Sequence, residues 1–253
     1  MSWSSQRKIT FISILALIIV ASFLVIFFVF FYKRETCSDG IQNQKEEGID
    51  CGGPCSNLCV KHNNPVILWT RWSKVSNTET YNLLTYGQNP NTGYGAYDVP
   101  YTYEIYDKKN LLIYSGSGVA YIPSLNNFVI LNDGIFIGDK VPVRVDFKIN
   151  YSKIVWQPIG ERELGIVAIN KNLIDEDSKP KLYVTLENQT INPLKDIESY
   201  AILYDENNNA VAFSKTKVDV INKNSREDIV FTWPSKFSVP IVKIEVISEV
   251  LEK

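Results

Sequence analysis

Two patterns of hydrophobic and polar residues divide the chain. From Ile9 to Tyr32 there is an unbroken run of 24 residues without a charge, nearly all of them Ile, Leu, Val, Phe or Ala. After residue 60, apolar and polar residues alternate in short runs, as in Val141–Ile149 and Ile241–Ile247, and the runs end at Asn-Pro, Asn-Asp-Gly and Asn-Asn-Asn turns. Alternation with a period of two is typical of half-buried strands. The pattern predicts one apolar helix followed by an all-β remainder.

The apolar run is long enough to cross a membrane. As a helix, residues 9–32 span roughly 36 Å, against a hydrocarbon core of about 30 Å. A cleaved signal peptide is the competing interpretation, but its apolar region is shorter and ends at a small-x-small site, whereas this run ends in Phe-Phe-Val-Phe-Phe-Tyr-Lys-Arg. A buried core helix would carry a polar face. We therefore predict an uncleaved single-pass helix over 9–32, after a short tail at 1–8.

Charge is distributed unevenly along the chain. Residues 1–34 contain four basic residues and no acidic one, and the remainder carries 22 basic against 28 acidic residues, a net charge of −6. An acidic body of this size has no electrostatic footprint for nucleic acid. The basic residues on the two sides of the apolar run are nearly balanced and only slightly favour a cytoplasmic N-terminus.

A cysteine-rich segment over residues 35–60 decides the orientation. It contains all four cysteines of the chain, Cys37, Cys51, Cys55 and Cys59, in a stretch rich in Gly, Asp and Asn. Such a stretch cannot build a hydrophobic core and needs cross-links or a metal to order it. Two disulfides, with three alternative pairings, fit an extracytoplasmic location. We therefore expect the C-terminal domains outside the cell membrane and the N-terminus in the cytoplasm.

The same segment offers two kinds of metal ligand. Oxygen atoms for Ca²⁺ could come from four side chains, Asp39, Asn43, Glu46 and Asp50, although the spacing is not that of an EF-hand. Zinc through Cys51, Cys55, Cys59 and His62 would lack the usual close pairs of ligands. A stapled spacer between membrane and first domain, with no zinc, is the interpretation that we prefer, and Ca²⁺ stays open.

The segment resembles a short module found between domains of bacterial and archaeal surface proteins. The pattern of that module is C-x-D-G-x-x-N-x-x-E-x-G-x-D-C-G-G-x-C. The matching residues are Cys37, Asp39, Gly40, Asn43, Glu46, Gly48, Asp50, Cys51, Gly52, Gly53 and Cys55. The resemblance implies a prokaryotic, extracytoplasmic setting and no enzymatic activity.

An internal repeat organises the β region. Tyr103-Glu-Ile-Tyr-Asp107 recurs as Ala201-Ile-Leu-Tyr-Asp205, and in each copy a proline follows the last tyrosine after 36 residues. Upstream, Asn89-Pro90 corresponds to Asn192-Pro193, with five extra residues in the first copy. Together with the short, regularly spaced strands, the repeat predicts two tandem antiparallel β-sandwiches, over residues 64–159 and 160–253.

Alternation within the repeated motif assigns a role to each residue. Ile105 and Leu203 should face the core, Tyr106 and Tyr204 the opposite side of the sheet. Asp107 and Asp205 begin turns, where their side chains can accept hydrogen bonds from the backbone.

The second copy resembles the FxLYD family of small immunoglobulin-like domains. The resemblance rests on Tyr183-Val-Thr-Leu-Glu-Asn188, on Ala201–Asp205 and on Arg226-Glu-Asp-Ile-Val-Phe-Thr232, with Ala201 in place of the aromatic residue of the family. The resemblance implies that the two sandwiches are immunoglobulin-like. It also implies a surface or envelope module of unknown ligand, without catalytic residues.

Aromatic residues mark one candidate binding surface. Tyr86, Tyr94 and Tyr97 lie in a Gly- and Asn-rich stretch that we interpret as an insertion loop, where they could stack on a glycan or a partner protein. The alternative is an ordinary turn whose tyrosines cover the sandwich edge. Of Trp69 and Trp72, we expect one in the core and the other at the domain junction.

The inventory of chemical groups argues against an enzyme. The chain has a single histidine, no Gly-rich phosphate loop before a helix and no nucleophile elbow. We therefore predict a membrane-anchored protein for adhesion or scaffolding of an envelope assembly, with envelope proteins or surface glycans as partners. The alternatives are a ligand-binding or sensor subunit of a membrane complex and, third, an envelope hydrolase.

Overall fold

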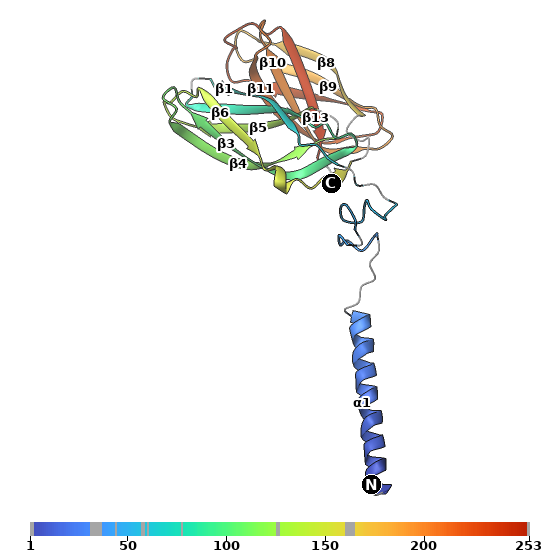
Figure 1. The fold of residues 1–253 in the computed structure, drawn as a ribbon. Coiled ribbons are helices and arrows are strands. Elements are labelled where there is room, and N and C mark those ends of the chain that lie inside the picture. The colour runs from blue at the N-terminus through green and yellow to red at the C-terminus, as the bar shows by residue number, and fades with distance from the viewer. Residues whose placement is uncertain are drawn as a thin grey trace. The chain divides into compact units, whose positions relative to one another are not determined.

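The computed structural model of the protein describes residues 3–30, 37–43, 45–56, 59, 61–76, 78–124, 127–159 and 165–251 (Figure 1). The chain divides into two compact units, residues 1–61 and 62–253, and each unit is described by itself.

The first unit begins with a single apolar helix, α1 (Trp3–Phe30). Residues 6–27 of this helix are long and apolar enough to cross a membrane. Two of its polar side chains, Thr10 and Ser22, donate hydrogen bonds to backbone carbonyls four residues earlier, so their hydroxyls are satisfied inside the helix. The helix thus starts before the predicted boundary at residue 9, and the predicted end at residue 32 lies outside the described residues.

The cysteine-rich segment that follows has almost no regular structure. In the part described, its β-pairing is limited to the bridge between Gly48 and Cys51, and its other backbone hydrogen bonds are local, such as that from the Cys55 amide to Gly52 O. The covalent order comes from two disulfides, Cys37–Cys55 and Cys51–Cys59, with Cα–Cα distances of 5.6 Å and 4.9 Å. This selects one of the three pairings that the sequence allows.

The second unit begins with a β-sandwich that carries a short 3₁₀ helix. Its elements are β1 (Val66–Lys74), β2 (Thr80–Gln88), β3 (Tyr94–Tyr106), β4 (Leu112–Ile122), β5 (Asn127–Phe136), β6 (Arg144–Ile149), η1 (Tyr151–Lys153) and β7 (Gln157–Pro158). One sheet has the order β1-β2-β5 and the other β4-β3-β6, with β7 paired to the start of β3. The core between them contains Leu83, Ile105 and Phe128.

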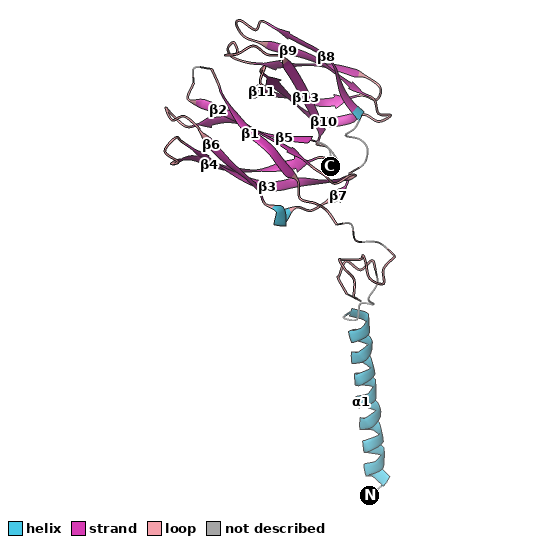
Figure 2. Ribbon diagram, turned by 45° about the horizontal axis from the view of Figure 1, so that its top comes forward, coloured by secondary structure: helices cyan, strands magenta, loops and turns pink. Residues whose placement is uncertain are grey.

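A second sandwich completes the unit (Figure 2). Its strands are β8 (Ile166–Ile174), β9 (Lys181–Asn188), β10 (Leu194–Tyr204), β11 (Ala210–Ile221), β12 (Arg226–Thr232) and β13 (Lys243–Val250). The sheets have the orders β8-β9-β12 and β11-β10-β13. Leu182, Leu203 and Phe231 belong to the core. Strands β1 to β6 therefore correspond to β8 to β13 in order and pairing, and the second unit is two tandem immunoglobulin-like sandwiches, as predicted.

The turns after the repeated motif confirm the duplication in atomic detail. Asp107 Oδ1 accepts hydrogen bonds from the amides of Lys109 and Leu111, and Asp205 Oδ1 accepts the equivalent bonds from Asn207 and Asn209. Each turn also contains an asparagine with positive φ, Asn110 at 58° and Asn208 at 59°, a conformation that asparagine tolerates better than most residues. The roles predicted for the two aspartates are confirmed.

One part of the sequence alignment between the copies is wrong. Asn89 is matched by Asn188, not by Asn192. Both asparagines are buried, Asn89 directly after β2 and Asn188 at the end of β9. Asn89 Nδ2 donates to Tyr94 O at the start of β3, and Asn188 Nδ2 donates to Asn192 O just before β10. On this alignment the first copy has one extra residue between the asparagine and the repeated tyrosine, so the five-residue insertion disappears.

Candidate functional site

The two sandwiches of the second unit pack against each other through unlike sheets. The outer face of β1-β2-β5 meets the outer face of β11-β10-β13, and the two faces share one apolar cluster. Its buried members are Leu84, Tyr86, Val129, Tyr200, Ile202, Tyr204, Ala210 and Phe213, and Trp69, Leu131 and Ile247 pack around them. We call this cluster the junction. Trp69 stacks on Tyr86 at 4.9 Å between ring centroids, while Trp72 packs against the first core, so the expectation for the two tryptophans is confirmed.

A carboxylate ties the two sides of the junction together. Glu245 accepts a hydrogen bond from Tyr86 Oη on the first sandwich at 2.8 Å and from Tyr204 Oη on the second at 2.7 Å. Burial raises the pKa of both tyrosines above the ordinary value, and the bond to Glu245 raises it further. The hydroxyls therefore stay protonated and donate. Glu249, also buried, accepts a hydrogen bond from the amide of Val129 across the same junction.

Each sandwich has a second outer face that lies outside the junction, that of β4-β3-β6 in the first and that of β8-β9-β12 in the second. Polar residues on these faces occupy positions that are apolar in the junction. Ile202, fully buried in the junction, corresponds to Glu104 of the first sandwich. Val129, on the other side of the junction, corresponds to Asp228 of the second sandwich, whose Oδ1 accepts from Thr185 Oγ1 at 2.7 Å. The two copies have diverged so that one pairing of faces is apolar.

A cleft of about 630 Å³ opens beside the junction. Three segments supply most of its wall: residues 72–76 at the end of β1, residues 210–215 of β11 and residues 232–239 from the end of β12 into the following loop. Because these segments come from both sandwiches, the cleft exists only when the junction is formed.

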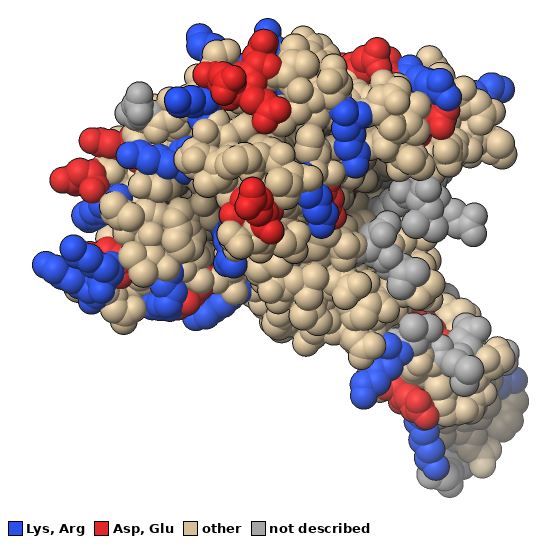
Figure 3. Space-filling view, turned by 90° about the horizontal axis from the view of Figure 1, so that it is seen from above, with Lys and Arg blue, Asp and Glu red and all other residues tan. Residues whose placement is uncertain are grey.

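The chemistry of the cleft is basic and aromatic. Lys74, Lys215 and Lys236 line it against a single carboxylate, Asp133, which lies 3.8 Å from the Lys215 ammonium group. Trp233, also in the wall, is 9% exposed, and its Nε1 has no hydrogen-bond partner among the described residues. On the face shown in Figure 3, basic and acidic side chains are interspersed. The cleft thus combines a positive balance with a buried donor that lacks an acceptor.

The predicted tyrosine loop is shorter than expected: residues 89–93 connect β2 to β3, and all three tyrosines lie in strands. Tyr86 lies inside β2 and is buried in the junction, so its placement on an exposed insertion is wrong. Tyr94 and Tyr97 lie at the start of β3, where Tyr94 packs on His62 (4.5 Å) and Tyr97 stacks on Tyr121 (4.7 Å). The structure does not gather the three tyrosines on one exposed loop, and a binding role for Tyr94 and Tyr97 stays a prediction.

The physical reason lies in the glycines of this stretch. Gly87 lies inside β2, and this position needs a glycine because the ring of Phe128 occupies the space that a side chain would take. Gly95 is in β3, where a Cβ would meet the Ile122 carbonyl and the Ile159 side chain. Glycine here makes room for close packing inside strands, which a sequence pattern does not distinguish from a loop.

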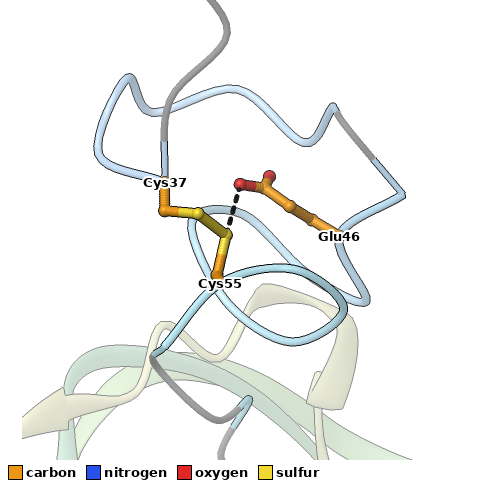
Figure 4. Close-up of side chains that lie close together, drawn as sticks. All are labelled: Cys37, Glu46 and Cys55. Carbon is orange, nitrogen blue, oxygen red and sulfur yellow. Dashed lines mark hydrogen bonds between the residues drawn. A yellow bond between two sulfur atoms is a disulfide. The ribbon is translucent and has the colours of Figure 1, made fainter.

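The disulfide-bonded segment forms the other candidate site, built around Glu46 (Figure 4). Glu46 is 7% exposed, and its Oε2 accepts from the amides of Asn43 (3.1 Å) and Asp50 (3.3 Å). Its Oε1 lies 3.0 Å from Cys55 Sγ. This sulfur is bonded to Cys37 and carries no hydrogen, so the dashed contact is a close approach of oxygen to sulfur. All four sulfurs are consumed in disulfides, which leaves no thiolate for zinc.

The four residues proposed for calcium do lie together, but the carboxylates of Asp39, Glu46 and Asp50 already accept hydrogen bonds from amides. Asp50 accepts from the amides of Asp39 and Gly40, and Asp39 accepts from the Ile41 amide and from Asn43 Nδ2. These bonds order the loop without an ion. Asn43 Oδ1 is buried without a hydrogen-bond partner among the described residues, so Ca²⁺ binding stays a prediction.

Sequence reasoning placed one tryptophan at a domain junction but did not identify the two faces that form it, although one signal was available. Tyr200-Ala-Ile-Leu-Tyr204 is apolar at every position, and a strand that is buried on both faces shows such a run. The equivalent strand of the first copy carries Thr102 and Glu104 at its outward positions. Glu245 gives no such signal, because an outward glutamate on an alternating strand is usually solvated.

Comparison with known proteins adds little to this description. No family model and no curated protein matches the chain. Among solved structures, the chain is similar to red sea bream transglutaminase, with 10% sequence identity and a TM-score of 0.22. The match covers 73% of this chain and 31% of that structure, so the chain spans well under half of its length. A likeness at this level carries no argument about function.

Proposed function

We propose that the protein is a membrane-anchored, extracytoplasmic binding protein that acts in adhesion or scaffolding of an envelope assembly. The observation that carries the proposal is the junction, because it makes two sandwiches into one body with a cleft between them. A pair of independent domains on a linker would offer no such shared site.

The anchor and the location rest on the first unit. Helix α1 has the length and composition of a membrane span, and the segment after it is held by two disulfides. Disulfides persist in oxidising compartments outside the cytoplasm. We therefore infer that α1 is an uncleaved anchor with its N-terminal side in the cytoplasm, and that residues 62–253 lie outside. The resemblance to FxLYD domains and to the surface-protein module supports the same setting.

Protease accessibility tests the location. In cells whose envelope admits the protease, cleavage should remove the C-terminal part, while a tag at Met1 stays protected until the cells are lysed. Protection of the C-terminal part in intact cells, with cleavage after lysis, would overturn the orientation.

Site-specific photo-crosslinking tests the binding role. A photoreactive residue at Lys236, in the cleft, should give a reproducible cross-link to one membrane or envelope protein. The matched position is Asp228 on the free outer face of the second sandwich, which should not. If neither position cross-links and a small solute raises the melting temperature of the chain instead, the ligand-binding or sensor alternative replaces scaffolding.

A further inference from the structure

The cleft beside the junction lies along the edge of a strand. Six consecutive residues of β11, 210–215, line it. Successive side chains of a strand point to opposite faces, so a cleft over one face would meet every second residue. Contact with all six places the cleft at the edge of β11. Among the described strands, β11 pairs with β10 on its other side, and a strand edge without a partner presents unpaired backbone groups.

The backbone direction of the neighbouring strand shows which groups these are. Tyr204 O accepts from the Val242 amide, on the β13 side of β10. Because alternate residues of a strand turn their N–H and C=O to opposite sides, Ala201 and Leu203 face β11, where their partners are Ser214 and Ala212. The backbone groups of Phe213 and Lys215, which alternate with those partners, then point to the free edge. They have the spacing at which an added strand forms its hydrogen bonds.

The remaining walls fit an extended chain with acidic side chains. Lys74, Lys215 and Lys236 outnumber the one carboxylate, Asp133. Among the described residues, the buried Trp233 Nε1 has no acceptor, and a carbonyl or carboxylate of the occupant would supply one once the indole shifts toward the cleft. Two aromatic side chains lie on the same wall, Trp233 and Phe237, with 5.4 Å between their ring centroids. They offer apolar contact for every second residue of the bound peptide.

We propose that the cleft binds an extended, acidic segment of a partner protein, which adds as a strand to the free edge of β11. Main-chain hydrogen bonds then supply the affinity and the lysines select the sequence, the mode of recognition used where a peptide extends a sheet. The inference rests on the proposed function and names the partner class for it. A glycan has no alternating amide and carbonyl groups to match the edge, so the geometry favours a peptide.

Peptide titration of the full chain in detergent tests this inference. The probe is a fluorescently labelled, end-capped nonapeptide of alternating valine and glutamate, followed by anisotropy and by tryptophan fluorescence. It should bind about tenfold more tightly than the same peptide with lysine in place of glutamate, and a central proline should weaken binding by about tenfold. No binding up to about 1 mM, or equal affinity for the acidic and basic peptides, overturns the proposal.

Two neighbouring lysines of β11 give a matched pair of variants. Lys215 lies in the cleft, whereas Lys217, two residues further and paired with Asp196, lies outside it. Lys215→Ala should lower the affinity for the acidic peptide several-fold and Lys217→Ala should leave it unchanged. Lys215→Pro also removes the outward N–H of the edge and should weaken binding beyond Lys215→Ala.

Melting temperature separates these effects from misfolding. If Lys215→Pro melts early, Lys74→Ala replaces it as the second cleft variant, with the same expected loss. Equal affinities for the wild type, Lys215→Ala and Lys74→Ala would overturn the assignment of the site. The titration is made in solution, so its failure leaves the membrane location untouched, and a reversed orientation in the protease experiment does not bear on the peptide.

Discussion

Ile202→Ala removes the centre of the junction between the two sandwiches. Ile202 is fully buried, yet it lies on the outer face of β10, while the next residue, Leu203, is fully buried in the core of the second sandwich. Truncation of a fully buried isoleucine costs about 2–5 kcal/mol, from the lost transfer free energy and the cavity left behind. A loss of this size is a large share of the stability of a domain.

The loss should appear in the coupling of the two sandwiches and not in either core. In urea, the wild type should show one transition for residues 62–253, and Ile202→Ala should separate it into two, with the first transition at lower denaturant. Circular dichroism and tryptophan fluorescence of the full chain in detergent measure both. Val230→Ala is the control, because Val230 is 41% exposed on the free face of β12. Val230→Ala should change the free energy of unfolding by no more than about 0.5 kcal/mol.

A small effect would refute the reasoning. If Ile202→Ala cost no more than Val230→Ala, the two sandwiches would not be joined in solution as the structure has them. The cleft would then lose its basis as well, since its wall comes from both sandwiches.

The other predictions concern the core, the junction tyrosines and the disulfides. Leu203→Ala should lower the free energy of unfolding by about 2–5 kcal/mol and lower the melting temperature. Tyr94→Ala should lower the free energy of unfolding by under about 1 kcal/mol and weaken partner capture instead. If both variants lowered the melting temperature equally, the binding hypothesis for Tyr94 would be abandoned. Burial and the hydrogen bonds to Glu245 raise the pKa of Tyr86 and Tyr204, so their contribution to the free energy of unfolding should be complete below about pH 10, where unfolded tyrosine titrates, and should decline as the pH rises further. Urea midpoints measured from pH 8 upward check this sign, and a free energy of unfolding that rises above pH 10 would contradict it. Non-reducing mass spectrometry should find the chain four hydrogens lighter and map the two disulfides described above, and four free thiols would contradict this. Ca²⁺ should raise the melting temperature of the oxidised chain if the acidic loop binds it, and an unchanged melting temperature would count against calcium binding.

Local rules were sufficient for the sandwiches and insufficient for their assembly. The repeat around Tyr106 and Tyr204 predicted two copies, the aspartate turns and the inward residues, because these depend on neighbours close in sequence. The identity of the covered outer face depends on residues more than a hundred positions apart, such as Tyr86 and Glu245. The sequence around Tyr86 resembles that of a loop, since glycines needed for packing inside a strand cannot be distinguished from glycines needed for a turn.

The cysteine pairing shows the same limit on a smaller scale. Four cysteines allow three pairings, and spacing alone does not separate them. In the structure, Asp50 accepts a hydrogen bond from the amide of Asp39 and Glu46 accepts one from the amide of Asp50, and these bonds order the loop between Cys37 and Cys51. The lining of the cleft could not be predicted either, since it requires the relative placement of β1 and β11.

The junction joins two unlike faces, and such a contact does not close on itself. A repeat that kept both kinds of face apolar would stack onto a second molecule, then a third, and grow into a fibre. Glu104 stands at the centre of one leftover face and Asp228 on the other, so each end of the pair is terminated by charge. Divergence after the duplication therefore set the length of the stack at two, and the same residues keep this mode of stacking from continuing where many copies are crowded together.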